Sequence, residues 1–334
     1  RHEPNKKELG NLALDSDGSF GLIIVRENTV MVVTDAGGSI PVYYGKGPKG
    51  LAVGTAVHHV ASCSGCTTID EVSVVDYLLN ATVCYPYSWY EEIRMAPPGS
   101  ACSLYLAGER ETSTYWLPTE PDTVNDPCDT KEWGARLRTQ VSSAIEHGIR
   151  GKETGRLLYS GGSDSRAVLS LIPESFNCTP TIVLDEKNRE YRLAKRSASL
   201  LGRNLDWVER PKDYYRPAVP ERIDTIGPGR DFQHTHIFGS VARYVEDVDV
   251  IMGGYLSDTL FKTQYMKNIE ASPNKPERLA EPTPGKITES TFEATEVGDV
   301  FRDLATQVRK RRRNHHQRLK EVRPLTAGNW HRLY

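Results

Sequence analysis

A six-residue stretch between two apolar segments concentrates residue types that bind anions and metal ions. It consists of Ser160, Gly161, Gly162, Ser163, Asp164 and Ser165. The apolar run before it favours a strand and the apolar spacing after it favours a helix, so the stretch is expected to form the turn between them. Two glycines let such a turn be tight and bring its backbone close to a ligand. The first amides of the helix carry partial positive charge and form an anion site.

The role of Asp164 differs between two interpretations of this turn. A carboxylate beside a bound phosphate requires a cation between them, and Mg²⁺ takes oxygen ligands of both kinds. The alternative is an ordinary glycine-rich turn in which serine and aspartate cap the helix. The spacing alone favours neither. No Gly-Lys-Ser/Thr sequence ends the turn, so it is not a Walker loop.

The elements around this turn are expected to alternate between strand and helix. Strands are predicted at 156–160, 179–185, 205–210 and 248–254, and helices at 165–171, 189–202 and 235–246. A preceding helix, capped by Asp129 or Thr130, carries Trp133, Leu137, Val141 and Ile145 on one face. This alternation predicts a parallel sheet covered on both faces. Ligands of such sheets bind beyond the carboxyl ends of the strands, where the six-residue turn lies.

The chain before residue 118 is expected to be β-rich. Two strands flank a short turn at 26–28, and a strand, a Gly/Lys/Pro turn and a second strand occupy 40–55. A helix is predicted at 71–82 and a hairpin around Gly108. We therefore predict an α/β protein with a first domain at 1–117, a linker at 118–128 and a second domain at 129–334.

Composition excludes several classes of protein. A chain of 334 residues with a net charge of −2 has room for two cores and no general attraction to nucleic acid or membranes. Its apolar runs are far shorter than the roughly 20 residues of a membrane helix. Six cysteines are too few for a disulfide scaffold, which favours the cytoplasm. We predict no nucleic-acid or membrane partner, and a homodimer is compatible with the sequence.

The motif Ser-Gly-Gly-x-Asp-Ser after a strand resembles the pyrophosphate loop (PP-loop) of ATP pyrophosphatase domains. The order of the matching segments along the chain is similar to that in the asparagine synthetase superfamily. Members of this superfamily join such a domain to an N-terminal glutaminase domain of the Ntn-hydrolase type. Segments 15–25, 33–44 and 91–106 resemble the later part of the glutaminase domain, and 249–261 resembles a second ATP-site motif. The resemblance implies a glutaminase-like domain incomplete at its N-terminus and an ATP pyrophosphatase domain that the chain covers incompletely.

The resemblance also implies a role for each matching residue. The loop residues Ser160, Gly161, Gly162, Ser163, Asp164 and Ser165 would cradle the pyrophosphate of ATP. Asp164 and Asp258 would hold Mg²⁺, and Val183 and Gly254 would offer backbone groups to the adenosine. Tyr255 would lie at the reacting centre with the two aspartates. The alternative for Asp258 is a helix cap.

The activity implied is amide-bond formation with ATP and Mg²⁺. A small-molecule or peptide carboxylic acid would be adenylated and transferred to an amine or to ammonia, including ammonia from glutamine. Asp17 matches a glutamine-recognition residue of the family, but no cysteine stands in the family's N-terminal nucleophile position. We expect that residues before Arg1 are missing, and if Arg1 is the true start this half would be a scaffold. The family has a catalytic lysine in the later part of its synthetase domain, and no residue of this sequence can be assigned to that position.

Tyr255 replaces a glutamate of the family's second motif, which argues against aspartate as the substrate. A ring-closing synthetase, like the β-lactam and macrolactam-forming relatives, is one alternative function. A tRNA-modifying enzyme would need RNA-binding appendages and catalytic cysteines, which are not evident. A non-enzymatic nucleotide-binding partner subunit is a further alternative.

Three weaker features receive structural interpretations. The basic segment 309–318 is expected to be a solvated helix. The Cys63–Cys66 segment is expected to cap a surface loop rather than bind zinc. His234 and His236 are expected to cap and pack at a helix start, with a contact to substrate or nucleotide as the alternative.

Overall fold

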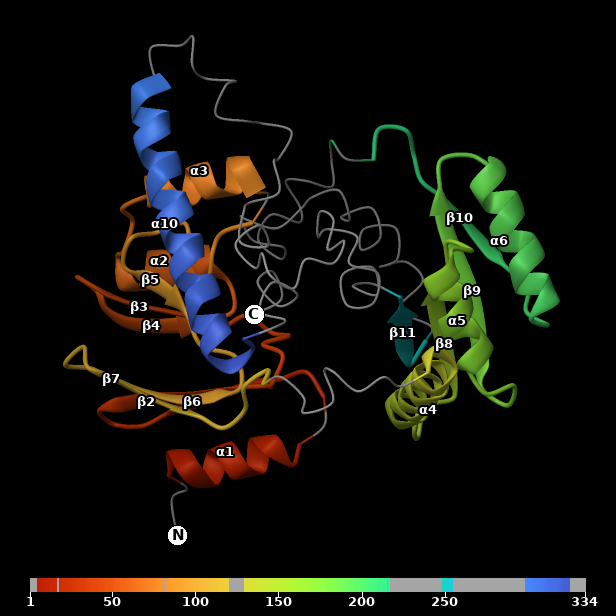
Figure 1. Cartoon of the computed structure of the whole chain (residues 1–334), viewed down its shortest axis with the longest axis horizontal. Coiled ribbons are helices and arrows are strands. Elements are labelled where there is room, and N and C mark those ends of the chain that lie inside the picture. Colours follow the sequence, from red (N-terminus) through yellow and green to blue (C-terminus); the bar gives the residue numbers. More distant parts are fainter. Residues whose placement is uncertain are drawn as a thin grey trace. The chain divides into compact units, whose positions relative to one another are not determined.

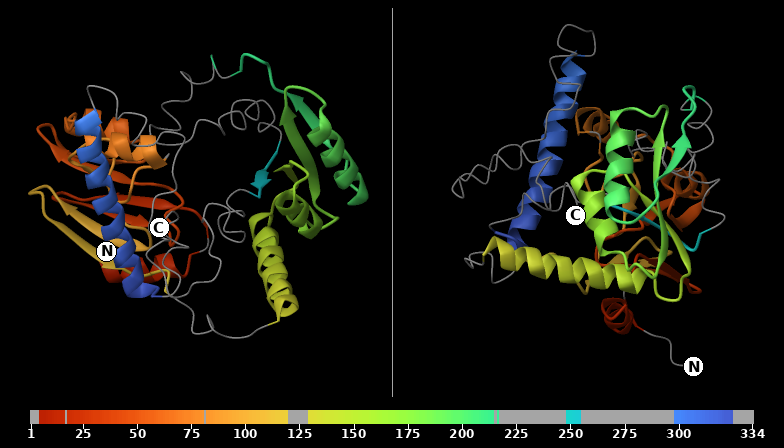
Figure 2. Two further views of the ribbon diagram at one scale, coloured as in Figure 1. Left: turned by 45° about the horizontal axis from the view of Figure 1, so that its top comes forward. Right: turned by 90° about the vertical axis from the view of Figure 1, so that its right-hand side faces the viewer.

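The computed structural model describes residues 5–16, 18–80, 82–119, 129–214, 216, 248–254 and 298–324 (Figures 1 and 2). They form two compact units. The first contains the described residues of 5–119 together with 298–324, and the second contains those of 129–216 and 248–254.

The first unit contains two antiparallel sheets. One has the order β1-β2-β6-β7 and the other β4-β3-β5. Their strands are β1 (Gly21–Val25), β2 (Thr29–Thr34), β3 (Tyr43–Gly47), β4 (Gly50–Gly54), β5 (Ile93–Met95), β6 (Ser100–Tyr105) and β7 (Arg110–Thr114). The sheets pack face to face through a core that includes Val32, Leu104 and Val42. Helix α1 (Lys6–Leu14) packs against the first sheet through Leu9 and Ala13, and helix α2 (Val57–Ser64) packs against the second.

The predicted hairpins of this unit are confirmed. Antiparallel pairing joins β1 to β2, β3 to β4 and β6 to β7. In the first turn, the Arg26 amide donates to the Thr29 carbonyl oxygen at 2.8 Å. Gly108 lies in the β6–β7 turn with φ of +105°, a left-handed conformation that favours glycine. The predicted helix at 71–82 is α3 (Glu71–Asn80).

The 25-residue helix α10 (Gly298–Val322) belongs to this first unit. Phe301, Ala305 and Val308 pack against Val72 and Val75 of α3. The sequence-based division placed these residues with the parallel sheet, whereas α10 packs on α3 in the β-rich unit.

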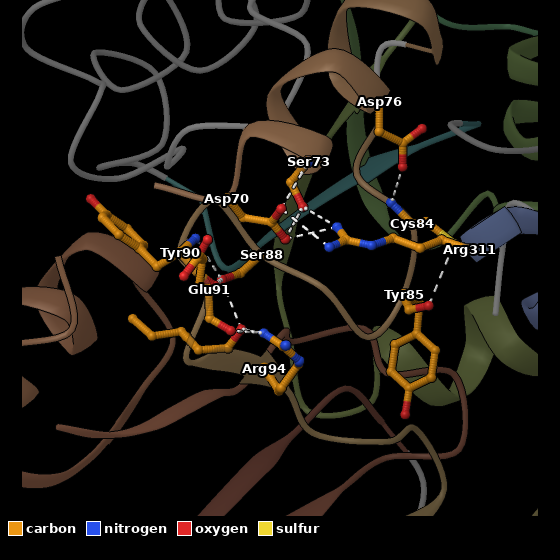
Figure 3. A network of polar contacts seen from close by, with 11 residues as sticks. Asp70, Ser73, Asp76, Cys84, Tyr85, Ser88, Tyr90, Glu91, Arg94 and Arg311 are labelled. Carbon is orange, nitrogen blue, oxygen red and sulfur yellow. Dashed lines mark hydrogen bonds and ion pairs between the residues drawn. The ribbon is translucent and has the colours of Figure 1, made fainter. Parts of the chain in front are cut away.

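The prediction that segment 309–318 is solvated was wrong for its central arginines. Arg311 donates to both carboxylate oxygens of Asp70, at 2.7 and 3.2 Å, and to the Ser73 hydroxyl (Figure 3). Arg312 Nε donates to Asp76 Oδ1 at 2.6 Å. Both pairs join α10 to the start and middle of α3, so the positive charge of the segment is partly neutralised within the fold.

The second unit is built on a parallel sheet of order β10-β9-β8-β11. Its strands are β8 (Thr154–Leu158), β9 (Asn177–Leu184), β10 (Asp206–Glu209) and β11 (Val250–Gly253), and its helices are α4 (Thr130–Gly148), α5 (Ser163–Leu171) and α6 (Arg189–Leu200). Asp129 caps α4 as predicted, because its carboxylate accepts from the Lys131 amide. The predicted helix at 235–246 lies outside the described residues.

The described helices pack on the core beside Leu157, Tyr159 and Ile182 of the sheet. Ala194 and Ala198 of α6 are fully buried there, and the Tyr159 and Ser197 hydroxyls lie 2.7 Å apart. The predicted α/β fold, with an antiparallel β-rich part before a parallel-sheet part, is confirmed. No helix among the described residues is long and apolar enough to cross a bilayer.

Candidate active site

The predicted turn lies where β8 leads into α5, at the carboxyl end of an inner strand of the parallel sheet. Gly162 is the N-cap of α5, and no side-chain hydrogen bond caps this helix. Ser160, Gly162 and Ser163 are exposed, whereas Gly161 and Ser165 are buried. Exposed backbone at an uncapped helix start is the arrangement that binds phosphate oxygens.

Gly161 makes the tight turn possible for two reasons. Its φ is +73°, which disfavours any residue with a side chain. A Cβ at this position would also lie 2.7 Å from Cα and 3.0 Å from the amide nitrogen of Ala194. The loop therefore packs directly against the backbone of α6.

We predict that Gly161→Ala destabilises the parallel-sheet unit. Backbone strain alone costs about 1–3 kcal/mol, and contact with the α6 backbone adds to it. The matched control is Gly148→Ala, where a Cβ would meet nothing within 4 Å; its effect should be neutral or stabilising by up to ~1 kcal/mol. Hydrogen–deuterium exchange of peptides covering β8 and α5 measures both. Equal protection in the two variants would contradict this packing argument.

The serine hydroxyls of the loop hold its shape. Ser160 Oγ accepts from the Gly162 amide at 3.2 Å and lies 3.4 Å from Ser165 Oγ. Ser165 Oγ also donates to the Gly162 carbonyl oxygen at 3.3 Å. Ser165, being buried, thus positions the turn from beneath. Sequence reasoning missed the guanidinium of Arg166, whose Nε donates to the same carbonyl oxygen at 3.3 Å.

Asp164 and Gly254, two of the predicted site residues, come together from different parts of the chain. A Cβ on Gly254 would lie 3.3 Å from Cβ of Asp164 and 3.4 Å from the Ser165 amide nitrogen. The end of β11 therefore approaches the first turn of α5, and only a residue without a side chain fits there without displacement. Asp164 is half-buried, and its carboxylate lies within reach of the Ser163 hydroxyl at 3.5 Å.

Val183 lies in β9, beside the loop strand. Leu158 pairs with Thr181, so Val183 stands two residues further along, level with Ser160. The Tyr159 amide continues this pairing by donating to the Thr181 carbonyl oxygen at 2.8 Å. The loop and Val183 are therefore on the same edge of the sheet.

Three predicted site residues lie outside the described residues: Asp17, Tyr255 and Asp258. The same holds for His234 and His236. Within the described ranges, no group of three or more His, Cys, Asp or Glu residues could by itself hold a metal ion. The single carboxylate at the loop instead fits a cation shared with phosphate oxygens, because Mg²⁺ is usually held by one or two carboxylates plus substrate phosphates.

Two of the described cysteines, Cys178 and Cys84, are buried thiols with raised pKa values. In the parallel-sheet unit, burial raises the pKa of the Cys178 thiol to about 11. In the first unit, burial raises the pKa of Cys84 to about 12. Thiols with such values are not nucleophiles at neutral pH. Gly65, with φ of +79°, ends α2 between Cys63 and Cys66. The predicted surface position holds for the exposed Cys63 and was wrong for Cys66, which is buried in the core beside α2.

The sequence matches no family model and no curated protein. Solved structures that show a weak similarity to this chain include the following two. One is an NH3-dependent NAD synthetase from Campylobacter jejuni subsp. jejuni NCTC 11168 in complex with the nitrate ion: 14% identity, TM-score 0.27, covering 38% of this chain and 59% of that one. The other is described as the allosteric regulatory enzyme of purine biosynthesis: 11% identity, TM-score 0.25, covering 79% of this chain and 62% of that one.

This chain thus spans less than two thirds of the length of either structure. At these TM-scores the two similarities carry no argument about function.

Proposed function

We propose that this protein is an ATP-dependent amide-bond-forming synthetase of the asparagine synthetase type. The observation that carries the proposal is the Ser160–Ser165 loop. It joins an inner parallel strand to an uncapped helix, with its buried Gly161 packed against α6 and its Asp164 facing the end of β11. The resemblance of its sequence to PP-loops supplies the ligand that such a loop would take.

In this proposal the backbone amides and the serine hydroxyls of the loop have different roles. The amides of Gly162 and Ser163 bind the pyrophosphate portion of ATP, while Ser160 and Ser165 keep the turn in shape. Asp164, together with Asp258, would hold Mg²⁺, which would supply neutralisation of the phosphate charge for in-line attack at the α-phosphorus. The adenosine lies along the same sheet edge, near Val183 and Gly254.

The proposed reaction has two steps. A carboxylate oxygen of the substrate attacks the α-phosphorus of ATP, and the bond to the bridging oxygen breaks with release of pyrophosphate. An amine or ammonia nitrogen then attacks the acyl carbon, loses a proton and displaces AMP. Asp17 is proposed to contact glutamine if glutamine supplies the ammonia. Tyr255 is proposed to lie by the acyl group, where a neutral phenol favours an acid other than aspartate.

The nucleotide products of turnover test this proposal. The chain is incubated with Mg²⁺-ATP, ammonium chloride and a panel of carboxylic acids, and the nucleotides are separated by chromatography. Adenylation predicts acid-dependent formation of AMP and pyrophosphate. Acid-dependent ADP and phosphate instead would show acyl-phosphate chemistry and contradict the proposed role of the loop.

A further inference from the structure

We propose that a groove between α4 and α5 binds an apolar portion of the carboxylic acid, so that the substrate class is an acid with an alkyl or aryl body. This inference rests on the proposed function and concerns the same site. The groove has a volume of about 390 Å³, and its walls include Leu137, Arg138 and Val141 of α4 and Asp164, Val168 and Leu171 of α5. Small-molecule sites commonly have volumes of about 300–1,000 Å³ and mostly apolar walls.

The apolar wall of the groove is the part of the apolar face of α4 that is not buried in the protein core. Trp133, Leu137, Val141 and Ile145 recur at four-residue spacing along one face. Ile145 packs against the core of the parallel-sheet unit and Val141 is half-buried, but Leu137 is 42% exposed. The helix therefore presents an apolar surface beside α5 that the described residues do not cover.

One residue, Asp164, belongs both to the groove wall and to the Ser160–Ser165 loop. Asp164 stands in the first turn of α5 and lines the groove. Val168 and Leu171, four and seven residues later, extend the same face of the helix away from the loop. An acid whose carboxylate lies beside the cation at Asp164 would therefore place its hydrocarbon body along Val168 and Leu171.

Arg138 supplies a positive charge on the groove wall. Among the described residues it has no ion-pair partner, in contrast to Arg136, which pairs with Glu132 at 2.5 Å and lies over the Trp133 ring. An incoming carboxylate is repelled by Asp164 and by the phosphates of ATP. A nearby cation offsets this repulsion and favours binding of the anionic acid.

Calorimetric titration of the chain in the presence of Mg²⁺ tests the groove without relying on turnover. The probes are octanoate and 3-phenylpropionate, with acetate as the acid that lacks an apolar body. We expect the two larger acids to bind and acetate to show no heat. Leu137→Asn should weaken their binding about 5-fold or more, because each buried methylene contributes about 0.8 kcal/mol. Arg138→Gln should weaken it by a similar factor.

Matched substitutions separate groove binding from general effects. Leu193→Asn changes a leucine on α6 that is 53% exposed and does not line the groove, and Arg136→Gln removes a charge two residues from Arg138. Both should leave the affinities unchanged. Absence of binding by both larger acids, or binding that Leu137→Asn does not weaken, would overturn the inference. Groove binding without acid-dependent AMP formation would support the inference and sink the proposed synthetase activity alone.

Discussion

Replacing Asp164 by asparagine is expected to lower acid-dependent ATP–pyrophosphate exchange by at least about 100-fold, the scale on which loss of one electrostatic group at a reacting centre acts. The amide keeps the size and position of the side chain but removes the negative charge that would hold Mg²⁺. The fold should be unaffected, because Asp164 is half-buried at the start of α5 and belongs to no apolar cluster.

Glu174→Gln is the matched control for Asp164→Asn. It removes one negative charge from an exposed residue in the turn before β9, at the opposite end of the sheet strands. Its exchange activity should equal that of the wild type. If Asp164→Asn retained near-normal exchange, Asp164 would have no role in holding the metal ion.

Asp76→Ala is expected to destabilise the β-rich unit by about 3–5 kcal/mol, the cost of removing one partner of a buried ion pair. The Arg312 and Asp76 side chains are only 5% and 1% exposed. Asp76 also accepts from the Asn80 side chain at 2.9 Å. It accepts from the Cys84 amide at 2.8 Å as well (Figure 3). The substitution leaves a buried guanidinium without its carboxylate and two donors without their acceptor.

An exposed ion pair on α10, the helix that carries Arg312, provides the control for Asp76→Ala. Asp299 pairs with Arg302 at 3.1 Å, but its side chain is 93% exposed, and such pairs contribute little. Asp299→Ala should cause no measurable change. Hydrogen–deuterium exchange of peptides from α3 and α10 measures both variants. Unchanged protection of α3 in Asp76→Ala would show that the Arg312–Asp76 pair does not stabilise this unit.

The parallel-sheet unit was predictable from sequence because its signals are local. Apolar runs alternate with helical spacing, and the glycines of the loop stand where a strand meets a helix. The capping role of Asp129 and the approach of Gly254 to Asp164 both follow from this order. The groove between α4 and α5 could not be predicted, since it depends on how two helices pack rather than on either sequence.

The helix α10 shows where local signals fail. Its run of arginines is typical of a solvated face, and nothing in segment 309–318 indicates that Asp70 and Asp76 lie opposite. Those carboxylates are 241 and 236 residues distant in sequence from their arginine partners. Helix α1, by contrast, was missed although Asn5 and Glu8 form a capping box, the spacing that marks a helix start.

Acid-dependent ATP–pyrophosphate exchange by the wild-type chain is the measurement that tests the central claim most directly. Labelled pyrophosphate, Mg²⁺-ATP and a panel of carboxylic acids, including octanoate and 3-phenylpropionate, are supplied without an amine. The account predicts that label enters ATP only when a suitable acid is present, because the adenylation step is then reversible. Exchange that proceeds equally without any acid would contradict the claim that the loop serves to adenylate a carboxylate.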